Sequence, residues 1–256
     1  MTHAKILTRA DGSTIAYHSI SGKSPGVVFL PGFKSDMMGS KALAVEAFCK
    51  KRGQAFTRFD YTGHGQSSGD FGDGCIGDWA KDTFDVVKNS TSGPQILVGS
   101  SMGGWIMLLA TLMDTSRIVG LVGIAAAPDF TENLIWNELS IEQKKGLETR
   151  GYVDLPNCYE GPAYRINQHL ITNGREHILL DKPIPIHCPV RLIHGQLDDD
   201  VPWQTSLDLA RRLESNDVEI SLIKSGDHRL SEPLDLERLT SVIDRLLDQL
   251  ETSNVA

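Results

Sequence analysis

The chain has 256 residues, which suits one large α/β domain or one domain with an insertion, and its 40% hydrophobic and 23% charged residues are typical of a globular protein. The formal net charge of −8 includes no strong basic block, so nucleic acid is not expected as a partner. No apolar run approaches the ~18 residues of a membrane span, so no span is expected.

The N-terminal residues Met-Thr-His-Ala-Lys-Ile-Leu carry neither a secretory signal nor an Arg/Ser-rich transit segment, which predicts a cytoplasmic protein. The cysteines show no Cys-x-x-Cys spacing and no Cys/His ligand pattern; they are Cys49, Cys75, Cys158 and Cys188. We therefore expect free thiols in a reducing compartment and no metal site.

Short apolar runs alternate with helical patterns along most of the chain, which predicts an α/β protein with a mostly parallel sheet and helices on both faces. In chain order, strands are predicted over 5–9, 14–19, 27–30, 54–59, 96–98, 118–125, 190–194 and 218–224. The first two flank Asp-Gly and are expected to pair as an antiparallel hairpin. Helices are predicted over 42–49, 78–87, from 105 onward and over 233–250.

Residues 128–187 interrupt this alternation, because they are rich in helical patterns and carry scattered apolar side chains. An insertion of this length between two core strands favours a helical lid over a site, with the core formed by residues 1–127 and 188–256. A packing appendage that only covers the sheet edge is the alternative. The side chains expected to line a substrate pocket are Trp136, Leu139, Tyr152, Tyr164 and Ile171.

Residues 95–104 read Gln-Ile-Leu-Val-Gly-Ser-Ser-Met-Gly-Gly, an apolar strand that runs directly into the pattern Gly-x-Ser-x-Gly. A helix begins at once with Trp105, so the turn between strand and helix must be sharp. Gly99 and Gly103 have no Cβ to clash in such a turn, and they let Ser101 project its hydroxyl above the sheet. The segment predicts a nucleophile elbow with Ser101 as the nucleophile, and a solvated Gly-Ser turn is the alternative.

A serine hydroxyl is a poor nucleophile until a base accepts its proton, so a histidine must reach it. His228 lies in Ser-Gly-Asp-His-Arg, a short loop after the last predicted strand. A loop at the carboxyl end of a parallel strand can extend over the sheet to the elbow, so we predict His228 as the base. His64 and His194 are expected to be structural, through hydrogen bonds to the backbone.

The histidine needs an acid that fixes its tautomer and stabilises the imidazolium. The strand over 190–194 runs into Gly-Gln-Leu-Asp-Asp-Asp-Val-Pro, which offers three adjacent aspartates. Asp198 comes first after the turn, where its side chain can still point across the sheet end, and is predicted as the acid. Asp199 and Asp200 are expected to be solvated or to cap the next helix.

The tetrahedral oxyanion of an acyl transfer needs two hydrogen-bond donors. The Met102 N–H follows the nucleophile and heads a helix, where free amides and the helix dipole favour negative charge. The second donor is expected after the strand over 27–30, in Pro-Gly-Phe-Lys, and Phe33 N–H is the choice. A plain turn at that position is the alternative.

With these loops in order, the chain resembles the serine α/β-hydrolase family along nearly its whole length. The segment from Asp60 to Ser67 is similar to that family's Asp-x-x-Gly-x-Gly-x-Ser loop, and the segment from His194 to Pro202 is similar to its His-Gly-x-x-Asp-x-x-Val-Pro acid loop. The order nucleophile, acid, base is also that of the family. The resemblance implies the α/β-hydrolase fold, hydrolysis of carboxylic esters or acyl-thioesters, and no cofactor.

Several segments resemble one subgroup of this family, the mitochondrial palmitoyl-protein thioesterases that also cleave acyl glucuronides. They are Leu30-Pro31-Gly32, Arg58-Phe59-Asp60-Tyr61, 93–101, Val201-Pro202-Trp203 and Asp227-His228-Arg229. The mitochondrial location is not carried over, because no transit segment is recognised. A carboxylate on the leaving group, as an acyl glucuronide presents, could be contacted by Arg165, Arg175 or Arg229, and solvated surface charge is the alternative for each.

The sequence thus predicts a serine hydrolase that forms an acyl-enzyme at Ser101 with Asp198 and His228, on a small-molecule or acylated-protein substrate. Two alternatives remain open: hydrolysis of the C–C bond of a β-diketone on the same three residues, and a receptor-like protein that binds a ligand and turns over slowly. The acyl chain, the leaving group and the oligomeric state are not determined by the sequence.

Overall fold

The computed structural model describes residues 3–155 and 164–253. Within these residues, eight strands form one sheet in the order β1-β2-β4-β3-β5-β6-β9-β10. The strands are β1 (Lys5–Thr8), β2 (Thr14–Ile20), β3 (Lys23–Leu30), β4 (Gln54–Phe59), β5 (Gln95–Ser100), β6 (Ile118–Ile124), β9 (Val190–Gly195) and β10 (Val218–Ile223). β2 pairs antiparallel with β1 and with β4, and the other neighbours in the sheet pair in parallel. The predicted hairpin and the mostly parallel sheet are therefore confirmed.

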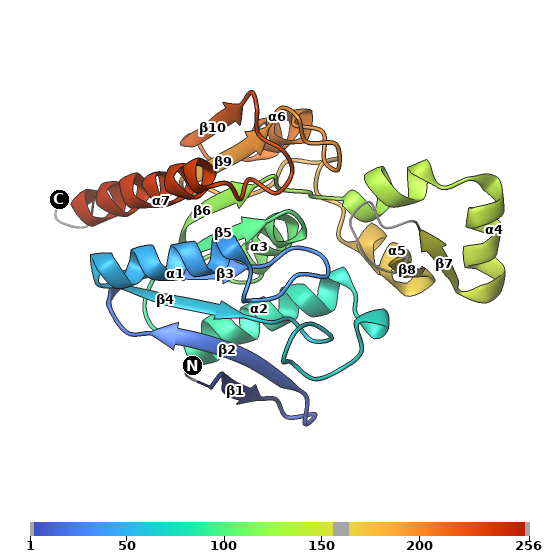
Figure 1. Ribbon diagram of the computed structural model, residues 1–256, viewed down its shortest axis with the longest axis horizontal. Helices are drawn as coiled ribbons and strands as arrows, with labels where there is room; N and C mark the ends of the chain where they lie inside the picture. Colours follow the sequence, from blue (N-terminus) through green and yellow to red (C-terminus); the bar gives the residue numbers. More distant parts are fainter. Residues whose placement is uncertain (1–2, 156–163, 254–256) are drawn as a thin grey trace.

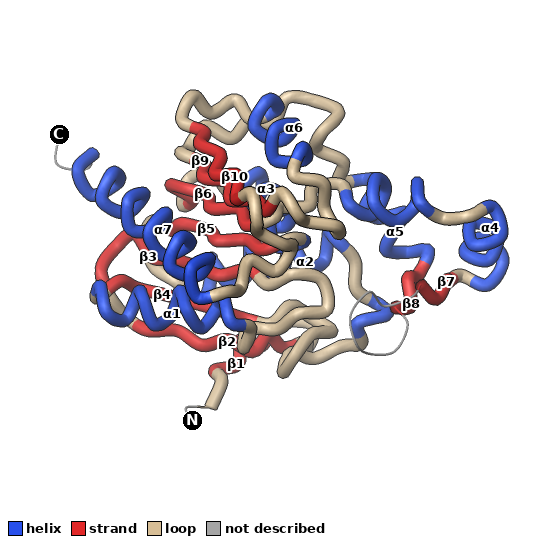
Figure 2. Tube along the Cα trace, turned by 45° about the horizontal axis from the view of Figure 1, so that its top comes forward, coloured by secondary structure: helices blue, strands red, loops and turns tan. Residues whose placement is uncertain are grey.

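Helices cover both faces of the sheet and enclose two apolar cores. They are α1 (Ser40–Arg52), α2 (Ile76–Ser90), α3 (Met102–Met113), α6 (Gln204–Arg212) and α7 (Pro233–Ser253). Successive residues of a strand point to opposite faces, so Val27 and Phe29 of β3 join the core under α1 and α7, while Val28 and Leu30 join the core under α2, α3 and α6. Figure 2 shows α1 and α7 side by side on one face. The α/β fold with helices on both faces is as expected.

The segment between β6 and β9 forms a separate group of elements at one end of the molecule (Figure 1). A π-helical turn (Thr131–Ile135) and a 3-10 turn (Trp136–Glu138) lead into α4 (Ile141–Arg150), β7 (Tyr152–Leu155), β8 (Tyr164–Asn167) and α5 (Gln168–Glu176). β7 and β8 pair antiparallel, whereas the sequence predicted helices alone. Strands of four residues are too short to show a clear alternation of apolar and polar side chains. The lid boundaries at 128 and 187 stay a prediction.

The turn from β5 to α3 is tightly packed, both within itself and against the end of β3. A Cβ atom at Gly99 would overlap the carbonyl oxygen of Gly103, and one at Gly103 would overlap the carbonyl oxygen of Leu30 at the end of β3. Ser101 itself has φ 54° and ψ −118°, a backbone conformation that residues other than glycine adopt only under strain. Glycine on both sides of Ser101 is therefore required by space, as the sequence analysis expected.

The first prediction concerns this turn. Gly103→Ala should lower the free energy of unfolding by about 1–3 kcal/mol or more, because an overpacked site forces the backbone to shift. Urea unfolding followed by circular dichroism measures the change. The matched control is Gly39→Ala, where the nearest atom to an added Cβ is 3.6 Å away, an ordinary contact. Equal losses in the two variants would contradict the close packing described for Gly103.

Candidate active site

Ser101 stands between the last residue of β5 and the first residue of α3. Its N–H donates to the carbonyl oxygen of Ile124 at 2.9 Å, and its own carbonyl oxygen accepts from Gly104 N–H at 2.8 Å and Ala127 N–H at 3.1 Å. These bonds fasten the strained residue to the neighbouring strand β6 and to the helix that follows. The Ser101 side chain is thereby fixed at the carboxyl edge of the sheet, where it lines a cavity.

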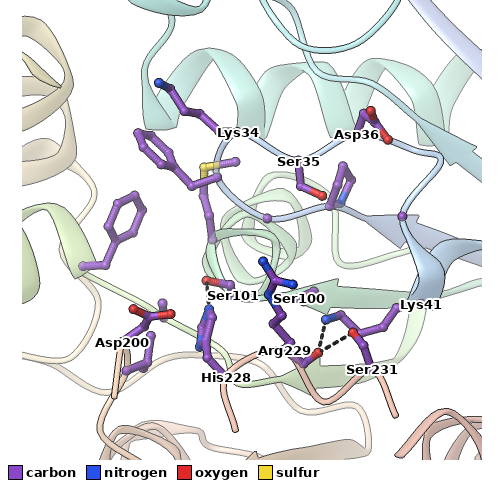
Figure 3. Close-up of a pocket in the computed structure, with 18 of the residues that line it drawn as sticks. Lys34, Ser35, Asp36, Lys41, Ser100, Ser101, Asp200, His228, Arg229 and Ser231 are labelled. Carbon is purple, nitrogen blue, oxygen red and sulfur yellow. Dashed lines mark hydrogen bonds between the residues drawn. The ribbon is translucent and has the colours of Figure 1, made fainter. Parts of the chain in front are cut away.

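His228 follows β10, and its ring lies directly beside Ser101 (Figure 3). Its Nε2 lies 3.1 Å from Ser101 Oγ, and its Nδ1 lies 2.8 Å from Asp198 Oδ2. Asp227 Oδ1 accepts the N–H of Leu230 at 2.9 Å and so braces the short loop that carries the histidine. The structure brings together the three side chains that the sequence predicts, in the order expected for proton transfer from serine to histidine.

The Asp198 carboxylate is fully buried and accepts hydrogen bonds on both oxygens. Oδ1 accepts the N–H groups of Asp200 at 3.0 Å and Val201 at 2.8 Å. Oδ2 lies 2.8 Å from His228 Nδ1 and 3.1 Å from His194 Nε2. Burial alone would raise the pKa of this carboxyl, but the hydrogen bonds from His194 and His228 hold it well below its usual range. Asp198 is therefore a fixed negative charge beside the His228 ring.

The other two aspartates of this loop differ from Asp198. Asp199 is exposed, as expected for a solvated neighbour. Asp200 lines the cavity, and its carboxylate, Asp198 and His228 offer polar atoms within 4.8 Å of one another. Of the two expected roles of Asp200, capping of α6 is not seen, because the N-cap residue of that helix is Trp203 and no side chain caps it, while solvation stays a prediction.

Two groups of side chains in the described residues have the composition of a metal site. One is Asp198, Asp200 and His228, whose first and last members are already joined by a hydrogen bond. The other is Cys75, which is buried at the N-cap of α2, with the exposed residues Asp78 of α2 and His169 of α5. Burial raises the pKa of Cys75 to about 11, so this thiol is protonated at neutral pH.

The two predicted oxyanion donors both lie beside Ser101. Met102 is the first residue of α3, where backbone N–H groups have no partner within the helix. Phe33 follows Gly32, and a Cβ atom at Gly32 would stand 3.5 Å from Ser101 Cβ, so this loop passes in contact with the serine. Met102 and Phe33 both line the cavity. Their role as donors stays a prediction.

The cavity has a volume of about 680 Å³ and two chemically different sides. The apolar side is formed by Phe33 and by residues of the insertion: Phe130, Leu134, Ile135, Leu155 and Ile166. The polar side is formed by Ser35, Ser40, Lys41, Arg229 and Ser231. Figure 3 shows Lys41, Arg229 and Ser231 together on one side of Ser101 and His228, with Asp200 on the other. The lining thus offers a substrate both apolar surface and charged groups beside the serine.

The predicted pocket residues are mostly elsewhere. Leu139 and Ile171 are buried in the core of the insertion. The Trp136 ring lies under Arg175, whose guanidinium carbon is 4.4 Å from the ring centroid. The guanidinium carbon of Arg165 lies 4.0 Å from the centroid of the Tyr152 ring. These four side chains stabilise the insertion and do not line the cavity. The side chain of the fifth, Tyr164, lies outside the described residues.

The sequence analysis missed the residues that do line the apolar side. Phe130, Leu134 and Ile135 come directly after the carboxyl end of β6, the same edge that carries Ser101. Ligands of open α/β sheets bind at this edge. Closeness in sequence to the end of the strand is therefore a better predictor of a pocket-lining residue than aromatic character. Two of the arginines that could contact a carboxylate on the leaving group differ in position. Arg165 pairs with Asp154 at 2.9 Å and does not line the cavity, whereas Arg229 does.

Comparison with known proteins gives the family. A family model described as serine aminopeptidase, S33 matches residues 24–144. The chain is 45% identical over 252 residues to the Bos taurus protein named palmitoyl-protein thioesterase ABHD10, mitochondrial, which covers 98% of this chain and 82% of the relative. The Homo sapiens protein of the same name is 44% identical over the same shares of both chains. A solved structure of alpha/beta hydrolase domain-containing protein 10 from mouse has a TM-score of 0.91, with 44% identity over 97% of this chain and 100% of that chain.

The chain therefore belongs to the α/β-hydrolase family and is a hydrolase enzyme, as the motifs predicted. The expectation of a cytoplasmic location is wrong, because each of the five curated relatives that match is named mitochondrial. An N-terminal segment without a recognisable targeting pattern was not sufficient ground for it. In the part of the chain that the structure describes, no helix has the length and apolar character to cross a membrane.

Proposed function

We propose that this enzyme is a serine hydrolase that cleaves acyl-thioesters and carboxylic esters through an acyl-enzyme at Ser101. The observation that carries the proposal is the hydrogen-bonded series from Asp198 Oδ2 through the His228 ring to Ser101 Oγ, at 2.8 and 3.1 Å. The series supplies a base within reach of the serine and an acid that orients the base. The relatives named palmitoyl-protein thioesterase support an acylated small molecule or protein as the substrate.

In the first half of the reaction, His228 Nε2 accepts the Ser101 proton while Oγ forms a bond to the acyl carbonyl carbon. The carbonyl oxygen becomes an oxyanion beside the N–H groups of Met102 and Phe33. The bond to the leaving group then breaks, and His228 returns its proton to the departing thiolate or alkoxide. Water, deprotonated by His228, next attacks the acyl-enzyme, and Ser101 leaves as the proton returns to it. Asp198 stays ionised and stabilises the imidazolium in both halves.

The acyl chain is assigned to the apolar side of the cavity. Phe130, Leu134 and Ile135 of the insertion line this side, and each CH₂ group buried there contributes ~0.8 kcal/mol. An insertion that supplies this wall acts as a lid over the acyl chain, which is the role proposed for residues 128–187. Affinity should therefore rise with acyl-chain length for short-to-medium chains. It should stop rising once the chain fills the cavity.

The leaving group is assigned to the polar side, where Lys41 offers a positive charge. Its Nζ donates to the carbonyl oxygen of Arg229, and no carboxylate in the described ranges lies within 4.0 Å of it. Burial lowers the pKa of Lys41 to about 8, and Arg229 acts in the same direction, while the carboxylates of Asp227 and Asp235 oppose the shift. A carboxylate on the leaving group would neutralise this charge.

Neither alternative from the sequence is favoured by a contact in the described residues. A β-diketone hydrolase and a receptor-like protein would use the same three side chains, so geometry does not separate them from an esterase. Substrates separate them: cleavage of a β-diketone alone would favour the first, and tight product binding with very slow turnover the second.

The second prediction tests the proposed acid. Asp198→Asn should lower kcat by about 10⁴-fold, because the His228 ring loses the acceptor that fixes its tautomer. The matched control is Asp199→Asn, one residue away and exposed, which should keep kcat within about twofold. Both are assayed on one p-nitrophenyl ester and one acyl-thioester, with melting temperatures measured alongside. Equal losses in the two variants would show that the loop matters through folding and not through proton transfer.

The third prediction concerns Lys41. Of two esters that differ only in a carboxylate on the leaving group, the charged ester should have the lower KM. Lys41→Met should reduce this difference in KM about 10-fold. In the wild type the preference should also decline as pH rises through about 8, because Lys41 then loses its proton. The exposed Lys51 of the same helix supplies the control Lys51→Met. A ratio unchanged in Lys41→Met assigns the leaving group elsewhere.

A further inference from the structure

His194 is a buried histidine that contacts the proposed acid but not the cavity. It lies in β9, four residues before Asp198, and its side chain has no exposed surface. Its Nε2 is 3.1 Å from Asp198 Oδ2 and 3.0 Å from the carbonyl oxygen of Val201, and its Nδ1 is 2.7 Å from Ser206 Oγ. The sequence analysis expected bonds to the backbone alone, and only the bond to Val201 is of that kind.

The surroundings of the His194 ring determine where its proton lies. The Asp198 carboxylate and the Val201 carbonyl can only accept, so the nitrogen between them, Nε2, must carry the proton. In the neutral ring Nδ1 is then the acceptor, and the hydroxyl of Ser206, a fully buried residue of α6, donates a hydrogen bond to it. Ser206 thus fixes the tautomer of His194, and Nε2–H is directed at the carboxylate.

We propose that His194 is a positioning residue for the hydrolysis: its Nε2–H shares Asp198 Oδ2 with His228 Nδ1–H and so limits how strongly the carboxylate holds the His228 proton. The inference rests on the proposed function, in which His228 is the base. Two donors on one oxygen divide its negative charge, since each hydrogen bond stabilises the carboxylate partly at the expense of the other. With His194 in place, kcat/KM is therefore expected to reach its plateau at a lower pH than without it.

Other charged groups also surround His228. Asp198 and Asp200 face it from the loop after β9, Asp227 and Arg229 flank it in its own loop, and Lys41 approaches that loop from α1. They all remain when His194 alone is replaced, so a change in the pH dependence can be assigned to the lost or retained Nε2–H.

The experiment compares two substitutions of His194. A glutamine amide nitrogen lies about as far from the backbone as histidine Nε2, whereas an asparagine amide ends near the position of Nδ1. His194→Gln therefore keeps a donor to Asp198, and His194→Asn removes it. The rising limb of kcat/KM against pH should move to higher pH by about half a unit or more in His194→Asn and stay near the wild type in His194→Gln. His187→Phe, at an exposed histidine, should leave the limb in place.

The direction of the shift distinguishes the proposal from a structural role. If His194 merely held the loop, its loss would let Asp198 move away from His228, the imidazolium would lose its partner, and the limb would move to lower pH. That result, or an unchanged limb in His194→Asn, overturns the proposal. Failure of the proposed function would show separately, as full activity in Asp198→Asn.

A measurement on the wild type keeps the proposal testable if His194→Asn does not fold. Nitrogen-15 NMR of labelled protein reports which ring nitrogen of each histidine carries the proton. His194 should be protonated on Nε2 and unprotonated on Nδ1 throughout the pH range of the rising limb. A His194 found protonated on Nδ1 could not donate to Asp198, and the proposal would be rejected.

Discussion

The turn between β5 and α3 is so tight that no Cβ atom fits at Gly99, where it would overlap Gly103, and so close to the end of β3 that none fits at Gly103. This crowding gives Ser101 its strained backbone, and the strain is maintained by hydrogen bonds to Ile124, Gly104 and Ala127. The serine therefore stays at the edge of the sheet where parallel strands end. The loops after β3, β9 and β10 all begin at this edge, which is why donors, acid and base can meet there.

Asp198 joins the rest of the site to that serine. Its two oxygens accept two backbone N–H groups and two histidine rings, so the carboxylate is fixed in position and its charge is retained although it is buried. One hydrogen bond leads outward through His228 to the cavity, and the other leads inward through His194 to Ser206 on α6. The inner branch links the cavity to α6, a helix with no residue in the lining of that cavity.

Features determined by local sequence patterns were predicted correctly, whereas features that depend on tertiary packing were missed. The central strands were located because buried strands read as short apolar runs, and Ser101, Asp198 and His228 were found because each follows a predicted strand. The strands β7 and β8 were missed since four residues show no clear period. The apolar wall was misplaced because aromatic residues such as Trp136 can equally well pack against cations inside the insertion. Lys41 gave no signal, since a lysine on a helix face is ordinarily exposed.

In the proposed mechanism Ser101 is the residue that carries the acyl group. Labelling with a fluorophosphonate, followed by mass spectrometry of the peptides, tests this directly, because the probe reacts with a serine only where a base activates it. The adduct should lie on Ser101, be lost in Ser101→Ala and persist in Ser100→Ala, since Ser100 is the buried last residue of β5 and makes no contact with His228 among those described. An adduct on Ser100, or on any other residue of the cavity, would contradict the account.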